Sequence, residues 1–233
     1  MDRRRVTLIP EWVRSGFVDL VDPVATGLVR WRVHPNAITV ASVVVLLGSG
    51  AAFGTGFPRW GALWLLISGI LDILDGKVAR RSGTASAFGA FFDSTLDRLG
   101  EAVLFCGIAI YFVTAAGQRW PILGLSVSLL ALSGSFLVSY ARARAEGLGL
   151  DCAVGIAQRP ERIVGLGVPT LFLGAGPHGW LLLGLMLVLA VANTITVVQR
   201  IAHVYRLTVP PQGASPVRGV VAPVLADPAP KGR

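Results

Sequence analysis

Six apolar runs separated by short polar connections make up most of the chain. They cover residues 38–53, 60–75, 88–115, 121–140, 163–173 and 180–198. Crossing the roughly 30 Å hydrocarbon core of a bilayer as a helix takes at least about 17 residues, and the first run is slightly short of that length. The fifth run is the weakest prediction, because it is brief, rich in glycine and contains Pro169. The pattern predicts an all-α integral membrane protein, built as a six-transmembrane-helix bundle.

The segments on either side of these runs have different compositions. Residues 1–34 mix arginines with bulky apolar side chains, which is typical of an amphipathic helix lying in the membrane interface. Pro35 suits the first turn of a helix, so we expect the bundle to begin there and to end near residue 206. Residues 207–233 hold six of the fourteen prolines, which predicts a disordered cytoplasmic tail. The sequence thus predicts an amphipathic segment at 1–34, a transmembrane domain at 35–206 and a tail at 207–233.

Composition supports a membrane protein and excludes an ordinary soluble domain. Hydrophobic residues make up 53% and charged residues 15% of the 233 residues. The net charge of +8 comes without any interleaved basic and aromatic motif, so nucleic acid is not an expected partner. Lysines and arginines gather at alternate ends of the runs, while the opposite connections hold only Arg59 and Arg119. By the positive-inside bias, both termini and the acidic stretch described next face the cytoplasm from the cell membrane.

Four aspartates interrupt the apolar pattern between the second and third runs. Asp72 and Asp75 are three residues apart, and Asp93 and Asp97 are four apart, so each pair shares one face of a helix. An aspartate near the middle of a membrane helix costs about 2.5–3.5 kcal/mol, so four unpaired ones would cost on the order of 10 kcal/mol. Divalent cations would offset this cost, and four carboxylates could hold two ions about 3.5–4 Å apart. An acidic turn in solvent would explain the charges but not the glycines among them.

Small and basic residues accompany the aspartates at fixed offsets, in the order D-x2-D-G-x2-A-R-x8-G-x3-D-x3-D. The pattern is complete here: Asp72, Asp75, Gly76, Ala79, Arg80, Gly89, Asp93 and Asp97. Eight specified positions within 26 residues make a chance match very improbable. The pattern resembles the signature of the CDP-alcohol phosphotransferase family. The resemblance implies a membrane enzyme that uses two divalent metal ions to displace CMP from a CDP-linked lipid with an alcohol.

The resemblance also implies roles for individual residues. The four aspartates would bind Mg²⁺, with Mn²⁺ as the alternative, and Asp97 would also be the general base that takes the acceptor's proton. The CDP-lipid would lie against Asn36, Thr39, Gly76, Ala79, Arg80 and Gly89. Glycine lets a nucleotide approach the backbone, although each small residue taken alone is equally compatible with helix packing. Asn36 and Thr39 are equally compatible with capping the first helix.

The second half of the chain indicates the acceptor. The stretches S-Y-A-R-A-R-A-E-G-L-G-L, G-I-A-Q-R-P-E-R and V-V-Q-R resemble the prokaryotic members that transfer the lipid to inositol phosphate. In that branch, residues at matching positions bind the acceptor's phosphate, which implies a site made of Ser139, Arg142, Arg162 and Arg200. Arginine suits this role because it makes bidentate contacts with phosphate, but the same arginines could be positive-inside flanking charges. Gln158 and Pro160 depart from that branch, where an acidic and a small residue are expected.

The expected reaction therefore joins CDP-diacylglycerol to inositol 1-phosphate, in a membrane protein that the resemblance implies is a homodimer. Glycerol 3-phosphate is the alternative acceptor, which would make the protein a phosphatidylglycerophosphate synthase. A membrane prenyltransferase also binds diphosphate through aspartates, but it has more spans and two aspartate motifs far apart in sequence. A cation carrier with acids inside the membrane stays formally open, and it predicts cation flux without CMP release.

Overall fold

The computed structural model describes residues 11–156 and 159–209, and within these ranges every regular element is helical. Residues 1–10, Gln158 and nearly all of the tail predicted at 207–233 lie outside the described residues. The all-α class is therefore confirmed for the part of the chain that the structure describes. The elements are α1 (Glu11–Arg30), α2 (Pro35–Gly54), α3 (Pro58–Arg81), α4 (Ala87–Thr114), α5 (Pro121–Glu146), α6 (Arg159–Leu173), the short 3₁₀ helix η1 (Pro177–Gly179) and α7 (Trp180–Thr208).

The starts of the helices follow from local sequence. Helices α2, α3 and α5 begin with proline, whose fixed φ and missing N–H suit the first turn. The cap of α2 is the imidazole of His34, which accepts a hydrogen bond from the backbone N–H of Asn36 at 3.2 Å. The cap is thus neither Asn36 nor Thr39. Ser86 caps α4 by accepting from the backbone N–H of Gly89 at 3.0 Å.

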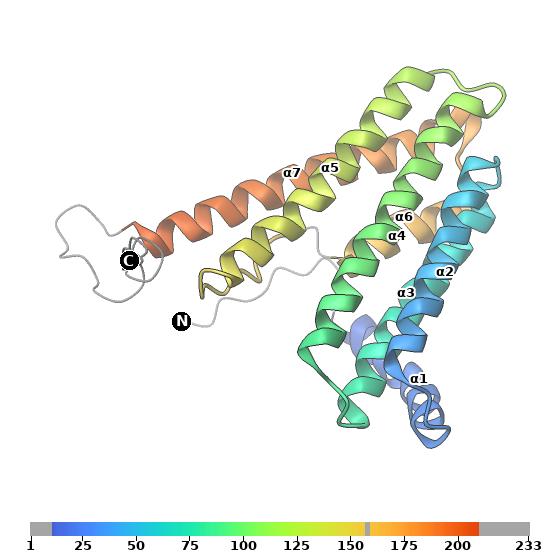
Figure 1. The fold of residues 1–233 in the computed structure, drawn as a ribbon. Coiled ribbons are helices and arrows are strands. Elements are labelled where there is room, and N and C mark those ends of the chain that lie inside the picture. Colours follow the sequence, from blue (N-terminus) through green and yellow to red (C-terminus); the bar gives the residue numbers. More distant parts are fainter. Residues whose placement is uncertain (1–10, 157–158, 210–233) are drawn as a thin grey trace, which may run out of the picture.

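The helices form two groups that share α4 (Figure 1). Helix α2 packs against α3 and α4, while α5 packs against α4 and α7, and α6 lies between α3 and α7. Helices α5 and α7 run side by side and lean away from α2, α3 and α4 toward the end where α7 finishes at Thr208 (Figure 1). The core where the groups meet is apolar, with Phe53, Ile108, Phe112, Leu182 and Met186 almost completely buried.

Two glycines set the closest approach between helices. A Cβ atom on Gly107 of α4 would lie 2.0 Å from the backbone oxygen of Gly50 on α2, which is far inside van der Waals contact. A Cβ atom on Gly50 would in turn lie 2.6 Å from the backbone oxygen of Val103. Small residues are what allow membrane helices to pack backbone against backbone. The tight α2–α4 contact holds α4, and the aspartates on it, in register with the rest of the bundle.

The connections alternate between the two ends of the bundle. Residues 55–57, 115–120 and 174–179 gather at the end opposite to the α3–α4 turn (Figure 1). There the ring nitrogen Nδ1 of His178 lies 2.9 Å from the backbone oxygen of Gly117, and a Cβ atom on Gly174 would lie 3.6 Å from Nε of Arg59. The aspartates lie at the other end. Helices α2 to α7 therefore run alternately up and down.

Within residues 11–156 and 159–209, three segments are long and apolar enough to cross a membrane: α2, α5, and η1 together with α7. The other three predicted spans are helices as well. Helices α3 and α4 are long but carry the charged residues of the signature. Helix α6 has 15 residues and is thus about 22 Å long, short of a hydrocarbon core, as its brief apolar run predicts.

Helix α1 docks on the end of α3 that carries the aspartates. Val21 and Ala25 are buried against an apolar cluster that includes Leu74 of α3. Beside this contact, the carboxylate of Asp22 accepts hydrogen bonds from Lys77 at 2.6 Å and from Arg81. These hydrogen bonds, that from Lys77 first, hold the pKa of Asp22 below its ordinary value. The contact places α1 across the outer end of α3.

Candidate active site

Three of the four signature aspartates converge at the α3–α4 hairpin. Asp72 and Asp75 come from α3 and Asp93 from α4, and each offers one oxygen such that the three oxygens lie within 4.8 Å of one another. The oxygen Oδ1 of Asp93 is buried and has no hydrogen-bond partner among the described residues. An unpaired buried carboxylate oxygen is costly, and hard divalent cations are coordinated by such oxygens. The three aspartates therefore fit a divalent metal ion.

A neighbouring helix orients Asp75. The hydroxyl of Thr39 on α2 donates to Oδ2 of Asp75 at 2.8 Å, and both side chains are buried. The same hydroxyl lies 3.3 Å from the backbone oxygen of Pro35, one turn earlier on α2. Thr39 thus links the start of α2 to the acidic cluster, and the start of α2 forms one wall of the site.

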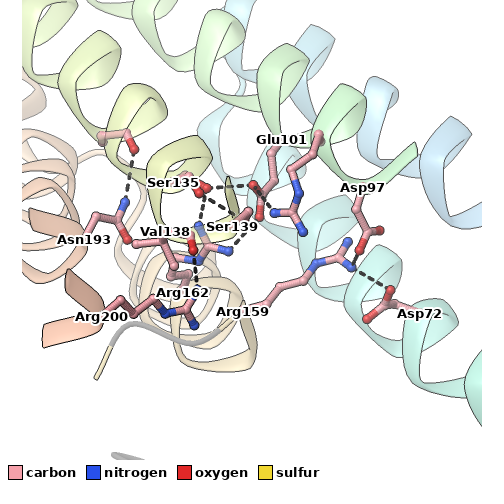
Figure 2. A network of polar contacts seen from close by, with 12 residues as sticks. Asp72, Asp97, Glu101, Ser135, Val138, Ser139, Arg159, Arg162, Asn193 and Arg200 are labelled. Atoms are coloured by element: carbon pink, nitrogen blue, oxygen red, sulfur yellow. Dashed lines mark hydrogen bonds and ion pairs between the residues drawn. The ribbon is translucent and has the colours of Figure 1, made fainter. Parts of the chain in front are cut away.

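Asp97 lies one helical turn beyond Asp93 and has a different partner. Its carboxylate accepts a hydrogen bond from Nη1 of Arg159, at the start of α6. The same Nη1 donates to Oδ1 of Asp72 at 2.8 Å, so one guanidinium joins α3, α4 and α6 (Figure 2). Asp97 is outside the group of three that could share one ion. It is buried.

An open cleft of about 160 Å³ begins at these aspartates. It runs between the start of α2, the end of α3 and the start of α4, and Asp75 and Asp93 form its inner end. All six residues that the sequence assigns to the CDP-lipid line it: Asn36, Thr39, Gly76, Ala79, Arg80 and Gly89. A Cβ atom on Gly89 would lie 3.2 Å from Oγ of Ser86 and 3.8 Å from Oδ1 of Asn36, so this glycine keeps the cleft open rather than packing a helix.

The four residues assigned to the acceptor lie around one segment of α5. Arg162 and Arg200 reach it from α6 and α7, and they donate to Oγ of Ser135 and to the backbone oxygen of Val138 (Figure 2). Ser139 donates to the backbone oxygen of Ser135 at 3.1 Å. Arg142 is a turn further along α5, half-exposed, and paired with Glu146 at 2.7 Å.

These four residues differ in how strongly they are already bound by the protein. Arg142 is within electrostatic reach of Arg200 and has only an exposed partner. Arg200 also donates to the backbone oxygen of Val154 at 3.0 Å, which closes the 147–156 loop onto α7. Arg162 is the most deeply held, because its guanidinium also pairs with Glu101 at 2.9 Å and only 8% of the side chain is exposed. The structure brings the four residues near one another, but the three arginines among them already have partners within the protein.

The comparison with protein families decides what kind of site this is. Residues 32–205 match the family model for CDP-alcohol phosphatidyltransferases. The chain belongs to the CDP-alcohol phosphatidyltransferase family.

Several members of this family are similar along most of the chain. An archaetidylinositol phosphate synthase of Methanothermobacter thermautotrophicus is 40% identical over 186 residues, covering 80% of this chain and 89% of the relative. A phosphatidylinositol phosphate synthase of Cutibacterium acnes is 37% identical, covering 84% of this chain and 97% of the relative. A crystal structure of the Mycobacterium tuberculosis phosphatidylinositol phosphate synthase with CDP-DAG bound has a TM-score of 0.69 and 32% identity, covering 80% of this chain and 94% of that one. The same Mycobacterium tuberculosis protein has been crystallised with manganese and citrate, and that structure also has a TM-score of 0.69, at 33% identity, covering 79% of this chain and 88% of that one.

In this CDP-alcohol phosphatidyltransferase, Arg159 contacts two of the signature aspartates, although the sequence pattern does not single it out. It lies 62 residues beyond Asp97, inside G-I-A-Q-R-P-E-R, where positive-inside placement explains any arginine. The same explanation covers Arg162, three residues further along the same stretch. Only the direction in which α6 begins distinguishes Arg159, which points at the aspartates, from Arg162, which points at α5 (Figure 2).

Proposed function

We propose that the protein transfers the phosphatidyl group of CDP-diacylglycerol to inositol 1-phosphate, releasing CMP and forming phosphatidylinositol phosphate. The observation that carries the proposal is the placement of the signature around one cleft. Two of the three aspartates suited to a divalent cation, Asp75 and Asp93, form its inner end, and the six residues assigned to the CDP-lipid line it. The relatives named for inositol phosphate products support the choice of acceptor.

The chain's own residues account for binding of the CDP-lipid. When bound at Asp72, Asp75 and Asp93, divalent cations supply the Lewis acidity that neutralises the diphosphate and stabilises CMP as it leaves. Gly76, Ala79 and Gly89 leave the cleft wide enough for a nucleotide, and Arg80 on its wall provides a cation for a phosphate. Asn36 and Thr39 are well placed to contact cytidine at the α2 wall.

Asp97 is the proposed general base. The acceptor's hydroxyl oxygen forms a bond to the β-phosphorus while the bond from that phosphorus to the oxygen of CMP breaks. Asp97 takes the hydroxyl proton, and no covalent protein intermediate is needed. Its position supports this role, since it is one turn from Asp93 yet outside the group of three carboxylates suited to one ion. Arg159 holds Asp97 in place and brings a positive charge to the point where the acceptor must enter.

The acceptor's phosphate is proposed to bind Arg142, Arg200 and Ser139, with Arg159 completing the site next to the aspartates. Arginines on three helices would recognise a phosphate more specifically than a single cation would. Arg162 is assigned to this site as well; its guanidinium is bonded to Glu101 and Ser135, and the effect of these bonds on α6 is argued below.

The same proposal includes a topology. Helices α2 to α7 would cross the cell membrane six times, with α1 in the cytoplasmic interface and the active site facing the cytoplasm. The alternation of connections and the excess of cations at the aspartate end support this orientation. The short α6 would reach across because it packs against longer helices rather than lipid alone. We also propose a homodimer, as the family resemblance implies.

One assay tests the reaction and its main alternative together. Purified protein is incubated with CDP-diacylglycerol, Mg²⁺ and either inositol 1-phosphate, inositol, glycerol 3-phosphate or serine, and CMP release is measured. We expect release with inositol 1-phosphate and little with free inositol, because only the former carries the phosphate. Release chiefly with glycerol 3-phosphate would make the protein a phosphatidylglycerophosphate synthase. Release with no acceptor in the panel would contradict the proposed function.

A second measurement tests the phosphate site. Arg142→Gln and Arg200→Gln should each raise the KM for inositol 1-phosphate about tenfold or more, since one charge-assisted hydrogen bond is worth about 1.5–3 kcal/mol. The Kd for CDP-diacylglycerol should barely change. Arg119→Gln, on the opposite end of the bundle, is the matched control that removes the same charge. An unchanged KM in both test variants would refute the site.

A further inference from the structure

Two salt bridges link α4 to α6, and they are separated by one helical turn. On α4, Glu101 follows Asp97 by four residues, and on α6, Arg162 follows Arg159 by three, so each pair of side chains shares a helix face. Asp97 is bonded to Arg159, and Glu101 is bonded to Arg162 (Figure 2). The Asp97 pair touches the active site. The Glu101 pair lies one turn deeper, and neither the signature nor the proposed chemistry uses Glu101.

Glu101 is a hub between three helices. Its Oε2 accepts hydrogen bonds from Nη1 of Arg98 at 3.1 Å and from the hydroxyl of Ser135 at 2.7 Å, and its Oε1 pairs with Nη2 of Arg162 at 2.9 Å. Ser135 also accepts a hydrogen bond from Arg162, which closes a three-membered ring of α4, α5 and α6 side chains. All three members of the ring are buried.

Burial gives this ring a single favourable arrangement. A buried carboxylate or guanidinium that loses its partner is left with the full cost of desolvation, so neither Glu101 nor Arg162 can move away alone. Helix α6 itself packs mainly on α3 and α7 rather than on α4. Polar side chains are therefore its principal link to the helix that carries Asp97.

A cavity beside the ring offers space into which Arg162 could move if its bond to Glu101 were lost. About 30 Å³ of space, room for one or two water molecules, lies between apolar residues and the side chains of Glu101, Arg159 and Arg162. Without the carboxylate of Glu101, Arg162 could turn into this space and α6 could rotate or slide. Arg159 would then no longer be directed at Asp97 and Asp72.

We propose that Glu101 is a positioning residue for the transfer reaction: it holds Arg162, and through the first turn of α6 it directs Arg159 at Asp97 and at the entering acceptor. The inference rests on the proposed function, which gives Arg159 its place beside the acceptor. Arg162 is the side chain through which Glu101 acts on α6.

The test compares Glu101→Gln, Arg159→Gln and the double variant. Glu101→Gln keeps the size of the side chain and one acceptor oxygen but removes the charge that holds Arg162. We expect it to lower kcat/KM for the acceptor about tenfold or more, and to leave the Kd for CDP-diacylglycerol within about twofold. In the Arg159→Gln background, adding Glu101→Gln should cost less than about threefold more, because the residue that it positions is already gone.

Asn193→Leu is the matched structural control. Asn193 is fully buried and donates to the backbone oxygen of Ala131 at 3.0 Å, so it also links two helices by a buried polar bond, but away from Arg159. Its loss should lower the melting temperature without a selective rise in acceptor KM. Ser135→Ala is the milder second variant if Glu101→Gln fails to accumulate, and it should show the same loss in smaller measure.

Full activity in Glu101→Gln, or losses that multiply in the double variant, would overturn the positioning role. Loss of CDP-diacylglycerol binding in parallel with turnover would instead make Glu101 a general structural residue. The comparison is made with whichever acceptor of the panel gives most CMP release. A wrong acceptor assignment would thus appear as CMP release with another acceptor in the wild-type protein. A wrong role for Glu101 would appear only in the comparison of the single variants with the double variant.

Discussion

Removing one carboxylate charge from the metal site should raise the stability of the metal-free protein while abolishing its activity. In the metal-free protein, Asp72, Asp75 and Asp93 bring three carboxylate oxygens within 4.8 Å of one another. At an effective dielectric constant of about 20, one such pair of charges repels by about 3.5 kcal/mol. Asp93→Asn removes two of the three pairs, or about 7 kcal/mol of repulsion before screening when the separation is taken as 4.8 Å. Solvent and the neighbouring Arg159 screen most of it.

We therefore expect the metal-free Asp93→Asn protein to be on the order of 1–2 kcal/mol more stable than the wild type, which corresponds to a rise of a few degrees in melting temperature. The same variant should lose CMP release, and most of the stabilisation that added Mg²⁺ or Mn²⁺ gives to the wild type, because that stabilisation grows with [L]/Kd. Metal titrations followed by thermal unfolding in detergent measure both effects.

Asp22→Asn is the matched control. It removes the same charge from an aspartate that lies outside the cluster and is paired with Lys77 and Arg81. It should leave the metal-dependent rise unchanged and should not raise the metal-free melting temperature. A metal-free Asp93→Asn protein that is less stable than the wild type, or one with an undiminished response to metal, would refute the reading of the three aspartates as one cation site.

Three further predictions concern the base, the helix packing and α1. Asp97→Asn should reduce kcat far more than it weakens binding of CDP-diacylglycerol, and an equal loss of both would make Asp97 chiefly a metal ligand. Gly107→Ala should destabilise the bundle by about 1–3 kcal/mol in thermal unfolding, whereas Gly184→Ala, whose Cβ would meet nothing within 4 Å, should not. Lys77 and Arg81 lower the pKa of Asp22 in the folded protein, so the contribution of Asp22 to docking of α1 is present above about pH 4 and is lost as the pH falls further. At neutral pH, amide hydrogen exchange of residues 21–30 should therefore be faster in Asp22→Asn than in the wild type. Unchanged exchange would contradict the link between Asp22 and docking of α1.

The sequence alone predicted the helices and the convergence of Asp72, Asp75 and Asp93, because both depend on local patterns. Apolar runs and prolines at helix starts are read directly from the chain, and the predicted starts at Pro35 and Pro121 coincide with those of α2 and α5. The spacing of the aspartates on two helices joined by a short turn leaves one plausible arrangement, a hairpin with its acids facing each other. The signature also indicated the family, which the match over residues 32–205 confirms.

Tertiary structure decided which arginines meet which acids. Arg159 and Arg162 are three residues apart in a stretch where either could be a flanking charge, and their partners lie on α3, α4 and α5, far away in sequence. The pairing depends on where α6 begins and how it is rotated. These depend in turn on packing against α3 and on a buried carboxylate at Glu101, which no spacing rule indicates. Local periodicity specifies the face of a helix, but only the assembled bundle specifies what that face meets.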